Sequence, residues 1–599
     1  MTLSTDAPVR RVSSPAALAG LTLVGTVRVL TLPRSLWEMD EVLFARAVER
    51  FDPLSHRPHP PGYPLVVGLG KALNLIFHEP FLSLVCLSLL STLVGYWAMV
   101  VAFRRIAGGP DAGRIAVAGA VLFQLSPAML VQGPLPMSDP PALMFLSLAL
   151  AAGAILQDGG GVWSALGLGA AASAAIGCRP QLALVVLPLL AVALWQTQGW
   201  RRRGQVVAAF ILVSLLWFIP LLVATRGFHS FLIYQSKQAS YVAAHDATSA
   251  RKSYPLHMVV KRFITHPWGR KAMAIPILAL ALAGTADLAW RRRTAALPLG
   301  VLTAGQLAVC LSIMDPADAV RYALPAVLGI AFAAAVGAQA LARLARVPPA
   351  AWIAPVLAAT MAIVYAWPVL AVRSRLISPP VSAIHWVERN VPPKSVILVG
   401  DDMAPHADYL LKGYDLQTVE EGFHHAARRP GAQAWLVAEG KSRWPGAVMF
   451  RWPNTDAYNK LTRGHYRIVT LSPIPLDHRF QSVRGVYGWE PSLLDARWRW
   501  LSDDALLRIF PRKWVTAVAV RLALDPTAPF LANTVTVSIN GQPGKTVEIA
   551  RGSAQAVEIP IPTNRPIEIA VRSARAWVPG GGDPRRLAVQ LLAVERIAR

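Results

Sequence analysis

Charge-free apolar runs constrain the fold of this chain more than any other feature of its sequence. Residues 80–103 and 115–135 contain no charged side chain. At roughly 1.5 Å per residue, each run is long enough to cross about 30 Å of hydrocarbon as a helix. A soluble core could not bury ten such runs, and charged residues make up only 16% of the chain, against about a quarter in soluble domains. The sequence therefore predicts a multi-spanning α-helical membrane protein.

We expect a transmembrane domain over residues 1–375 with about eleven helices, because that many apolar runs alternate with polar connections. The predicted spans are residues 14–33, 80–103, 115–135, 138–156, 161–178, 180–198, 205–225, 272–290, 295–314, 319–341 and 350–372.

Clustered arginines set the expected orientation of these helices. Arginine pairs or triples follow alternate helices, at residues 104–105, 201–203, 291–293 and 343–346. If the N-terminus with Arg10 and Arg11 is cytoplasmic, every cluster falls on the cytoplasmic side, where Lys and Arg are in excess. An odd number of helices then places residues 376–599 outside the cytoplasm. Topology and anionic lipid head groups thus explain the net charge of +25 without nucleic acid, and we expect a bacterial plasma (inner) membrane.

Two longer loops are predicted on the same outer side, at about residues 34–79 and 226–270. In the first loop, residues 39–51 place their apolar side chains on one face of a helix, which is typical of an amphipathic helix lying in the membrane interface. Residues 62–77 are apolar but contain Lys71, and counting them as a span would invert all later loops. We expect a second interfacial helix there.

The last third of the chain reads as two soluble modules. Residues 376–475 mix a helical pattern at 381–390 with apolar strand-like runs at 396–400 and 435–438, which indicates an α/β module. Residues 476–599 are predicted to form a β-sandwich, because short alternating runs are separated by turn residues. The strongest turn signal is Asn540-Gly541, directly after an alternating run.

The most informative residues for chemistry lie in the first outer loop. Asp40 and Glu41 are adjacent carboxylates at the membrane surface, where one of them could act as a general base. Acidic residues also favour the first turn of any helix, so a purely structural role is the alternative. His56 and His59 have the spacing of a metal pair, but the prolines around them predict a loop. No metal ligand is therefore predicted, although a divalent metal stays possible, and no required cofactor is predicted.

Several short motifs resemble those of a known family in the same order along residues 30–375. The chain is similar to the multi-spanning glycosyltransferases of the protein mannosyltransferase and aminoarabinose transferase type, which have the GT-C fold. The motifs are Asp40-Glu41, then His59-Pro60-Pro61-Gly62-Tyr63-Pro64, Met137-Ser138-Asp139-Pro140, Cys178-Arg179-Pro180-Gln181, and Asp318-Ala319-Val320-Arg321-Tyr322.

This resemblance implies a polyprenyl-phosphate sugar as donor and an extracytoplasmic protein, lipid or glycan as acceptor. It implies that Asp40 is the catalytic base, with Glu41 beside it. The lipid phosphate leaves in the reaction and needs cationic donors, and Arg179 and Arg321 stand at the outer ends of predicted helices. The remaining residues matched to substrate binding are His59, Tyr63, Asp139 and Tyr322.

Each of these assignments has a simpler alternative. Arg179 and Arg321 could be arginines that extend from helix ends to the interface, and Ser-Asp-Pro around Asp139 is also an ordinary helix start. Lys237, Arg251 and Lys252 in the second loop could bind phosphate, but a solvated basic loop is the better explanation for them.

Two other functions compete with the predicted inverting glycosyltransferase: a lipid-sugar transporter or flippase, and a non-catalytic membrane protein that binds glycans. A transporter predicts ionisable residues near the middle of spans and two related halves. The predicted spans contain Arg28 and Asp287, and the chain has no evident internal repeat. Fold alone does not decide between these functions.

The arginine pattern predicts the outcome of a topology experiment. Reporter fusions after Arg105, Arg203, Arg293 and Arg346 should report the cytoplasm, and fusions within 226–270 or after Pro379 should report the outer side. Protection of residues 376–599 from protease in intact spheroplasts, with cleavage only after lysis, would show that this topology is wrong.

Overall fold

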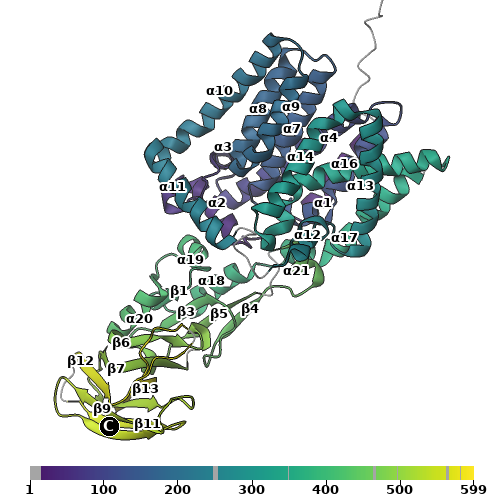
Figure 1. Ribbon diagram of the computed structural model, residues 1–599. Helices are drawn as coiled ribbons and strands as arrows, with labels where there is room; N and C mark the ends of the chain where they lie inside the picture. The colour runs from purple at the N-terminus through teal and green to yellow at the C-terminus, as the bar shows by residue number, and fades with distance from the viewer. Residues whose placement is uncertain are drawn as a thin grey trace, which may run out of the picture. The chain divides into compact units, whose positions relative to one another are not determined.

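The computed structural model describes residues 15–246, 254–347, 350–462, 467–495, 497–561, 565–580 and 582–598 (Figure 1). Arg10, Arg11, Arg251 and Lys252 lie outside these residues. The chain forms two compact units. The helical unit contains Met1–Ile377 together with Pro453–Tyr466, and the C-terminal unit contains Ser378–Trp452 together with Arg467–Arg599.

All eleven predicted apolar runs form helices, and within the part of the chain that the structure describes seven helical segments are long and apolar enough to cross a membrane. Six of these are α4 (Pro80–Ala107), α7 (Asp139–Gln157), α10 (Trp200–Ala224), α13 (Lys271–Arg291), α14 (Arg293–Ser312) and α16 (Leu324–Leu344), and the seventh, Ala351–Asn390, includes nearly all of α17 (Ala350–Arg375). Shorter apolar helices are α1 (Pro15–Leu30), α3 (Pro64–Phe77), α5 (Ala112–Gln124), α8 (Val162–Cys178) and α9 (Ala183–Gln196). The chain is thus a multi-helix membrane protein, and the number of eleven spans remains a prediction.

Two predicted spans are broken where proline begins a new helix. The run 115–135 divides into α5 and α6 (Pro127–Gln132), because Ser126 Oγ accepts from Met129 N at 3.3 Å and so caps a new helix. The run 319–341 divides into α15 (Ala319–Tyr322) and α16, which has a proline in its first turn. This second break leaves Arg321 in a short turn of its own.

Helices α13 and α16 approach each other closely at two glycines. A Cβ atom at Gly284 would collide with the carbonyl oxygen of Ala333, and one at Gly337 would collide with that of Leu280. Small residues at such a crossing allow two backbones to approach, which is how helices gain dispersion energy in a lipid solvent.

The first loop contains the helix expected there, α2 (Met39–Glu49), which is followed by a turn and α3. Phe44, Ala47 and Val48 are buried, as the pattern predicted, but Val42, Leu43 and Ala45 on the other sides of α2 are buried too. The helix is thus enclosed by protein on most sides, and its predicted place in the membrane interface stays a prediction. The second loop contains α11 (Phe228–Tyr241) and α12 (Leu256–Ile264). A late helix, α21 (Asp456–Leu461), also belongs to the helical unit, where Arg270 Nε donates to Asp456 Oδ2 at 3.1 Å.

In the C-terminal unit, the α/β part has a five-stranded sheet of order β2-β1-β3-β5-β4. Strands β1 to β3 are parallel, and β4 and β5 are antiparallel to their neighbours. The elements are α18 (Pro379–Asn390), β1 (Val396–Val399), α19 (Ala404–Leu410), β2 (Asp415–Thr418), α20 (Val419–Arg428), β3 (Ala434–Glu439), β4 (Val448–Arg451) and β5 (Ile468–Pro473). The helix and strands predicted for this part are present.

The remaining strands form one eight-stranded antiparallel sheet of order β10-β9-β12-β7-β13-β8-β11, with β6 paired to β7. They are β6 (Gln481–Glu490), β7 (Trp498–Ile509), β8 (Val515–Ala523), β9 (Ala532–Ile539), β10 (Lys545–Ala550), β11 (Ala554–Pro560), β12 (Ile567–Ser573) and β13 (Val589–Ala598). These strands form a single sheet around one apolar core, where the sequence predicted a sandwich of two sheets. Strands β9 and β10 form the expected hairpin, with Asn540-Gly541 in the loop between them.

Candidate functional site

Arg321 connects two carboxylates that are far apart in the sequence. Its Nη1 donates to Asp40 Oδ2 at 2.8 Å, and its Nε donates to Asp139 Oδ2 at 2.8 Å. Arg179 forms a second ion pair with Asp139. The four side chains are therefore an alternating row of two positive and two negative charges, which we call the charge row.

Each member of the charge row stands at the end of a helix. Asp40 lies in the first turn of α2, Asp139 opens α7, Arg179 follows the last residue of α8, and Arg321 lies in α15. Of the two proline breaks described above, only the one before α16 lies at this row, where it leaves Arg321 in α15. Helix ends from four parts of the chain thus meet at one place.

The two carboxylates differ in access to solvent. Asp40 exposes 24% of its side chain and Asp139 only 3%, although both contact Arg321. A buried carboxylate between two guanidinium groups is held by charge on both sides. Asp139 is therefore fixed in place, whereas Asp40 can meet a molecule arriving from water.

Three rings pack beside Asp40. His59 and Tyr63 lie 5.0 Å apart between ring centres, and the Phe44 ring packs edge-on against both. His59 Nδ1 lies 3.7 Å from Asp40 Oδ1. Burial lowers the pKa of His59, against the opposing effect of the Asp40 charge, so the imidazole is neutral at neutral pH. Burial likewise raises the pKa of Tyr63, which keeps its phenol protonated.

Tyr322 packs against the other end of the charge row. The guanidinium carbon of Arg179 lies 5.3 Å from the centre of the Tyr322 ring, within the range of a cation–π contact. The carbonyl oxygen of Tyr322 accepts from Gln306 Nε2 at 2.8 Å, which ties α15 to α14. The structure thus brings Asp40, His59, Tyr63, Asp139, Arg179, Arg321 and Tyr322 together at one site.

Glu41 has a different place from Asp40. Its side chain is fully buried, and its Oε2 accepts from the backbone N–H of Trp37 at 2.7 Å. Burial raises the pKa of Glu41 to about 8, although the charge of Arg373 opposes this shift. Successive residues of a helix point about 100° apart, which explains why these neighbours have different partners.

Two neighbours of the site were given no role by the sequence reasoning. Gln181 hydrogen-bonds to Tyr63, and the motif Cys178-Arg179-Pro180-Gln181 contained this residue without a function assigned to it. Arg373 Nη2 donates to Glu38 Oε1 at 3.4 Å, so the end of α17 is linked to the first loop. An arginine at the outer end of an apolar run was the only sign of this second pair.

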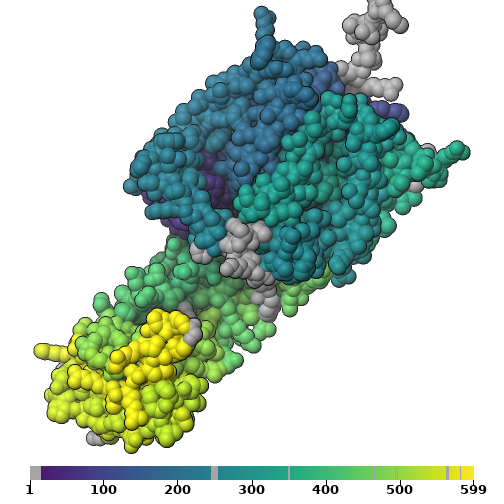
Figure 2. Space-filling model, viewed as in Figure 1, coloured from purple at the N-terminus to yellow at the C-terminus, as the bar shows by residue number. Residues whose placement is uncertain are grey.

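On the face of the helical unit seen in Figure 2, purple atoms from the N-terminal part of the chain lie in a hollow between the blue atoms of α10 and α11 and teal atoms of later helices. Among the residues that the structure describes, no group of three or more His, Cys, Asp or Glu side chains is placed to hold a metal ion.

The comparison with known proteins gives one family and several similar structures. The family model of dolichyl-phosphate-mannose-protein mannosyltransferases matches residues 58–223. The crystal structure of ArnT from Cupriavidus metallidurans bound to undecaprenyl phosphate is 16% identical, with a TM-score of 0.50 over 77% of this chain and 98% of that chain. No protein of curated function matches the sequence.

Two further structures are similar at lower scores. The oligosaccharyltransferase of Archaeoglobus fulgidus, in complex with zinc and sulfate, is 12% identical with a TM-score of 0.49 over 98% of both chains. The arabinofuranosyltransferase AftD from Mycobacteria is 13% identical with a TM-score of 0.45, over 97% of this chain and 58% of that chain. The expected resemblance is confirmed: the chain has the GT-C fold of membrane glycosyltransferases.

Proposed function

We propose that this protein is an inverting glycosyltransferase that moves a monosaccharide from a polyprenyl-phosphate donor to an acceptor hydroxyl outside the cytoplasm. The observation that carries the proposal is the accessible Asp40 carboxylate, held by Arg321 beside a buried Asp139. An acceptor hydroxyl needs a base and a phosphate leaving group needs cationic donors, and the charge row supplies both.

Asp40 is the base in this proposal. In the transfer step the acceptor oxygen bonds to the anomeric carbon of the sugar while its proton passes to a carboxylate oxygen of Asp40. The bond from that carbon to the phosphate oxygen breaks, and the electron pair leaves with the polyprenyl phosphate. Attack from the side opposite the leaving group inverts the anomeric carbon.

Arg321 and Arg179 stabilise the leaving phosphate. A guanidinium group has five N–H donors on three nitrogens. Arg321 uses two of these nitrogens, because its Nη1 donates to Asp40 and its Nε donates to Asp139. Donors therefore remain for phosphate oxygens, and charge-assisted hydrogen bonds of this kind are strong. The undecaprenyl phosphate bound to the similar ArnT structure supports a lipid phosphate as donor group.

His59, Tyr63 and Tyr322 complete the proposed substrate site. They present a neutral imidazole, the protonated phenol of Tyr63 and the Tyr322 side chain beside the charges, which suits hydrogen bonding to sugar hydroxyls. Glu41 is a positioning residue, because its carboxyl group holds the Trp37 backbone and so the start of α2.

The charged residues inside predicted spans argue against a transporter. Arg28 is buried in α1, where its Nη2 donates to the carbonyl oxygen of Gln124 at 2.8 Å and its Nη1 to that of Leu130 at 3.3 Å. Asp287 pairs with Arg291 one helical turn away, at 2.8 Å. Both side chains have local protein partners that account for their charge, which favours the enzyme over the transporter.

Replacing Asp40 tests the proposal directly. We expect Asp40→Asn to insert and fold normally but to transfer sugar about 10²–10⁴-fold more slowly, since an amide accepts no proton. Asp52→Asn is the matched control, because Asp52 lies in the same loop with 25% of its side chain exposed. The readout is transfer from a radiolabelled polyprenyl-phosphate sugar; a normal rate in folded Asp40→Asn protein would exclude Asp40 as the base.

Asp139→Asn should act on stability as well as on transfer. The amide leaves Arg179 and Arg321 buried with one carboxylate between them, and breaking a buried ion pair costs roughly 3–5 kcal/mol. We expect a clear fall in the thermal unfolding temperature of the purified protein, which Asp40→Asn should not show. An unchanged unfolding temperature in Asp139→Asn would mean that the charge row does not hold the helix ends together.

Glu41 should make stability depend on pH. Its pKa is raised from 4.5 to about 8 in the folded protein, so the folded state keeps a proton that the unfolded chain releases. The resulting stabilisation is complete below the unfolded pKa and is lost as pH rises through about 8. We expect Glu41→Gln, which does not titrate, to flatten this decline and to slow transfer far less than Asp40→Asn. An identical pH profile of unfolding in both proteins would contradict the buried-acid assignment.

A further inference from the structure

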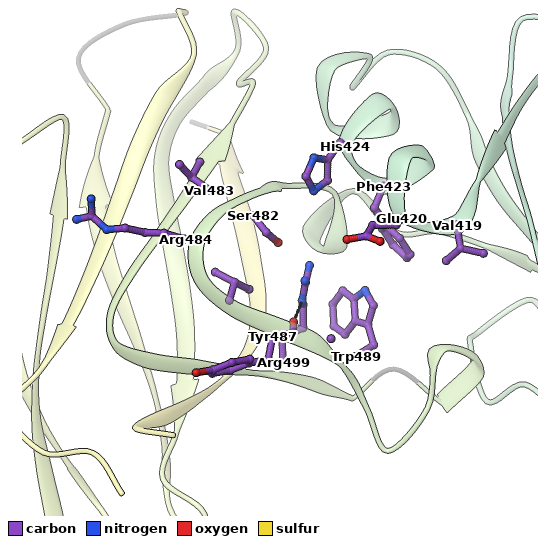
Figure 3. Close-up of a pocket in the computed structure, with 12 residues that line it drawn as sticks. Val419, Glu420, Phe423, His424, Ser482, Val483, Arg484, Tyr487, Trp489 and Arg499 are labelled. Atoms are coloured by element: carbon purple, nitrogen blue, oxygen red, sulfur yellow. Dashed lines mark hydrogen bonds between the residues drawn. The ribbon is translucent and has the colours of Figure 1, made fainter. Parts of the chain in front are cut away.

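The C-terminal unit contains a cavity that the proposed transfer step does not use. It lies between α20 and strands β6 and β7 and has a volume of about 530 Å³, within the range of small-ligand sites (Figure 3). Twelve residues line it, from Val419 to His424 on the helix side and from Ser482 to Arg499 on the sheet side.

Polar side chains from both sides converge on this cavity. Glu420 and His424 come from α20, and Ser482 and Arg499 come from the sheet, with their polar ends directed into the same space in Figure 3. Among the described residues, Glu420 makes no hydrogen bond or ion pair. Its carboxylate and the guanidinium of Arg499 therefore face the cavity as an acceptor and a donor.

Arg499 is held firmly in the cavity wall. Its Nε donates to the carbonyl oxygen of Tyr487 at 2.5 Å, and its guanidinium carbon lies 5.5 Å from the ring centres of both Phe480 and Trp489. Trp489 is fixed in turn, because His478 stacks on it with ring centres 5.2 Å apart. A fixed donor loses little conformational entropy when a ligand binds.

Two buried polar atoms of the lining have no hydrogen-bond partner among the described residues. They are the Oγ atom of Ser482 and the indole Nε1 of Trp489. Buried donors without partners are rare in native proteins. Both atoms have under 1 Å² of accessible surface, so they lie behind the cavity wall and a ligand in the cavity contacts the more exposed polar groups instead. Phe423, Tyr487 and Trp489 add aromatic surface to this polar set. A sugar ring has the same combination of an apolar C–H face and hydroxyl edges.

An extended peptide fits this cavity less well. Only β7 pairs with β6 in the described sheet, so β6 has an edge that a peptide strand could join. Its register shifts three times, between Ser482 and Arg484, Arg484 and Val486, and Val486 and Trp489. Such irregularities interrupt the row of backbone donors and acceptors that a peptide strand needs. Recognition here depends on side chains.

The charges of the lining favour a neutral ligand over an anion. Two arginines line the cavity, but the charge of Arg484 is paired with Asp504 at 3.0 Å, so Arg499 and Glu420 are the opposite charges that face the space. Arg499 would attract a phosphate or a uronic acid, but the Glu420 carboxylate at the same cavity repels both. A hydroxyl group can donate to Glu420 and accept from Arg499, so adjacent sugar hydroxyls satisfy both side chains.

We propose that this cavity binds a neutral saccharide. If the proposed transferase function holds, the cavity retains the glycan that accepts the new sugar, whereas saccharide binding itself does not depend on transfer. On that condition, the acceptor of the transfer is a neutral glycan.

The test measures binding of neutral hexose di- to pentasaccharides to the full-length protein in nanodiscs, without sugar-based detergent. We expect binding that Glu420→Ala and His424→Ala each weaken about tenfold or more. Their neighbours give matched controls on the same helix: Glu421→Ala and His425→Ala should bind like wild type, because neither residue lines the cavity.

The outcomes separate this proposal from the catalytic one. Asp40→Asn protein should bind the saccharides normally while failing to transfer sugar, so loss of transfer leaves the binding result intact. Absence of binding by every neutral oligosaccharide, equal binding by Glu420→Ala and wild type, or tighter binding of inorganic phosphate or uronic-acid oligosaccharides would each overturn the proposal.

Discussion

The pairing of Arg321 with two carboxylates is the interaction on which the helical unit's candidate site depends. Asp40 and Arg321 are 281 residues apart, and Asp139 and Arg321 are 182 apart. Hydrocarbon offers no hydrogen bonds, so charged side chains near a membrane need protein partners or water. Helix ends that carry these charges therefore come together, and the first loop, α7, α8 and α15 share one site because of it.

The three carboxylates at and beside the charge row, those of Asp139, Asp40 and Glu41, have different surroundings. Asp139 is enclosed by arginines and fixes the geometry, while Asp40 keeps contact with solvent. Glu41 is drawn inward to the Trp37 backbone, where a charge is costly. An accessible carboxylate with a rigid support is the arrangement that the proposed general-base step needs.

Much of the fold follows from local sequence patterns, because long apolar runs and alternating strands carry their periodicity in a short window. The eleven apolar runs, helix α2 and the hairpin at Asn540-Gly541 were all predictable in this way. The breaks before α6 and α16 were missed, since hydrophobicity alone does not show that Ser126 caps a new helix. The single eight-stranded sheet was missed because strand patterns do not specify how many sheets the strands form.

The candidate site was predictable as a set of residues but not as a set of contacts. Motif resemblance named Asp139, Arg179 and Arg321 separately, yet which arginine pairs with which carboxylate depends on tertiary packing. Glu38 with Arg373 shows the same limit, because neither residue has a distinctive local pattern.

Helix α21 affects how the protein can be divided. The chain leaves the C-terminal unit at Trp452, contributes Ala457, Tyr458 and Leu461 to the buried interior of the helical unit, and returns at Arg467. A fragment beginning at Ser378 would expose these apolar side chains to water, and the helical unit ending at Ile377 would lose the acceptor that Leu461 provides for Gln132. The two units are therefore interleaved along the gene, and an exchange of the C-terminal unit at a single point after Ile377 would also remove α21 from the helical unit.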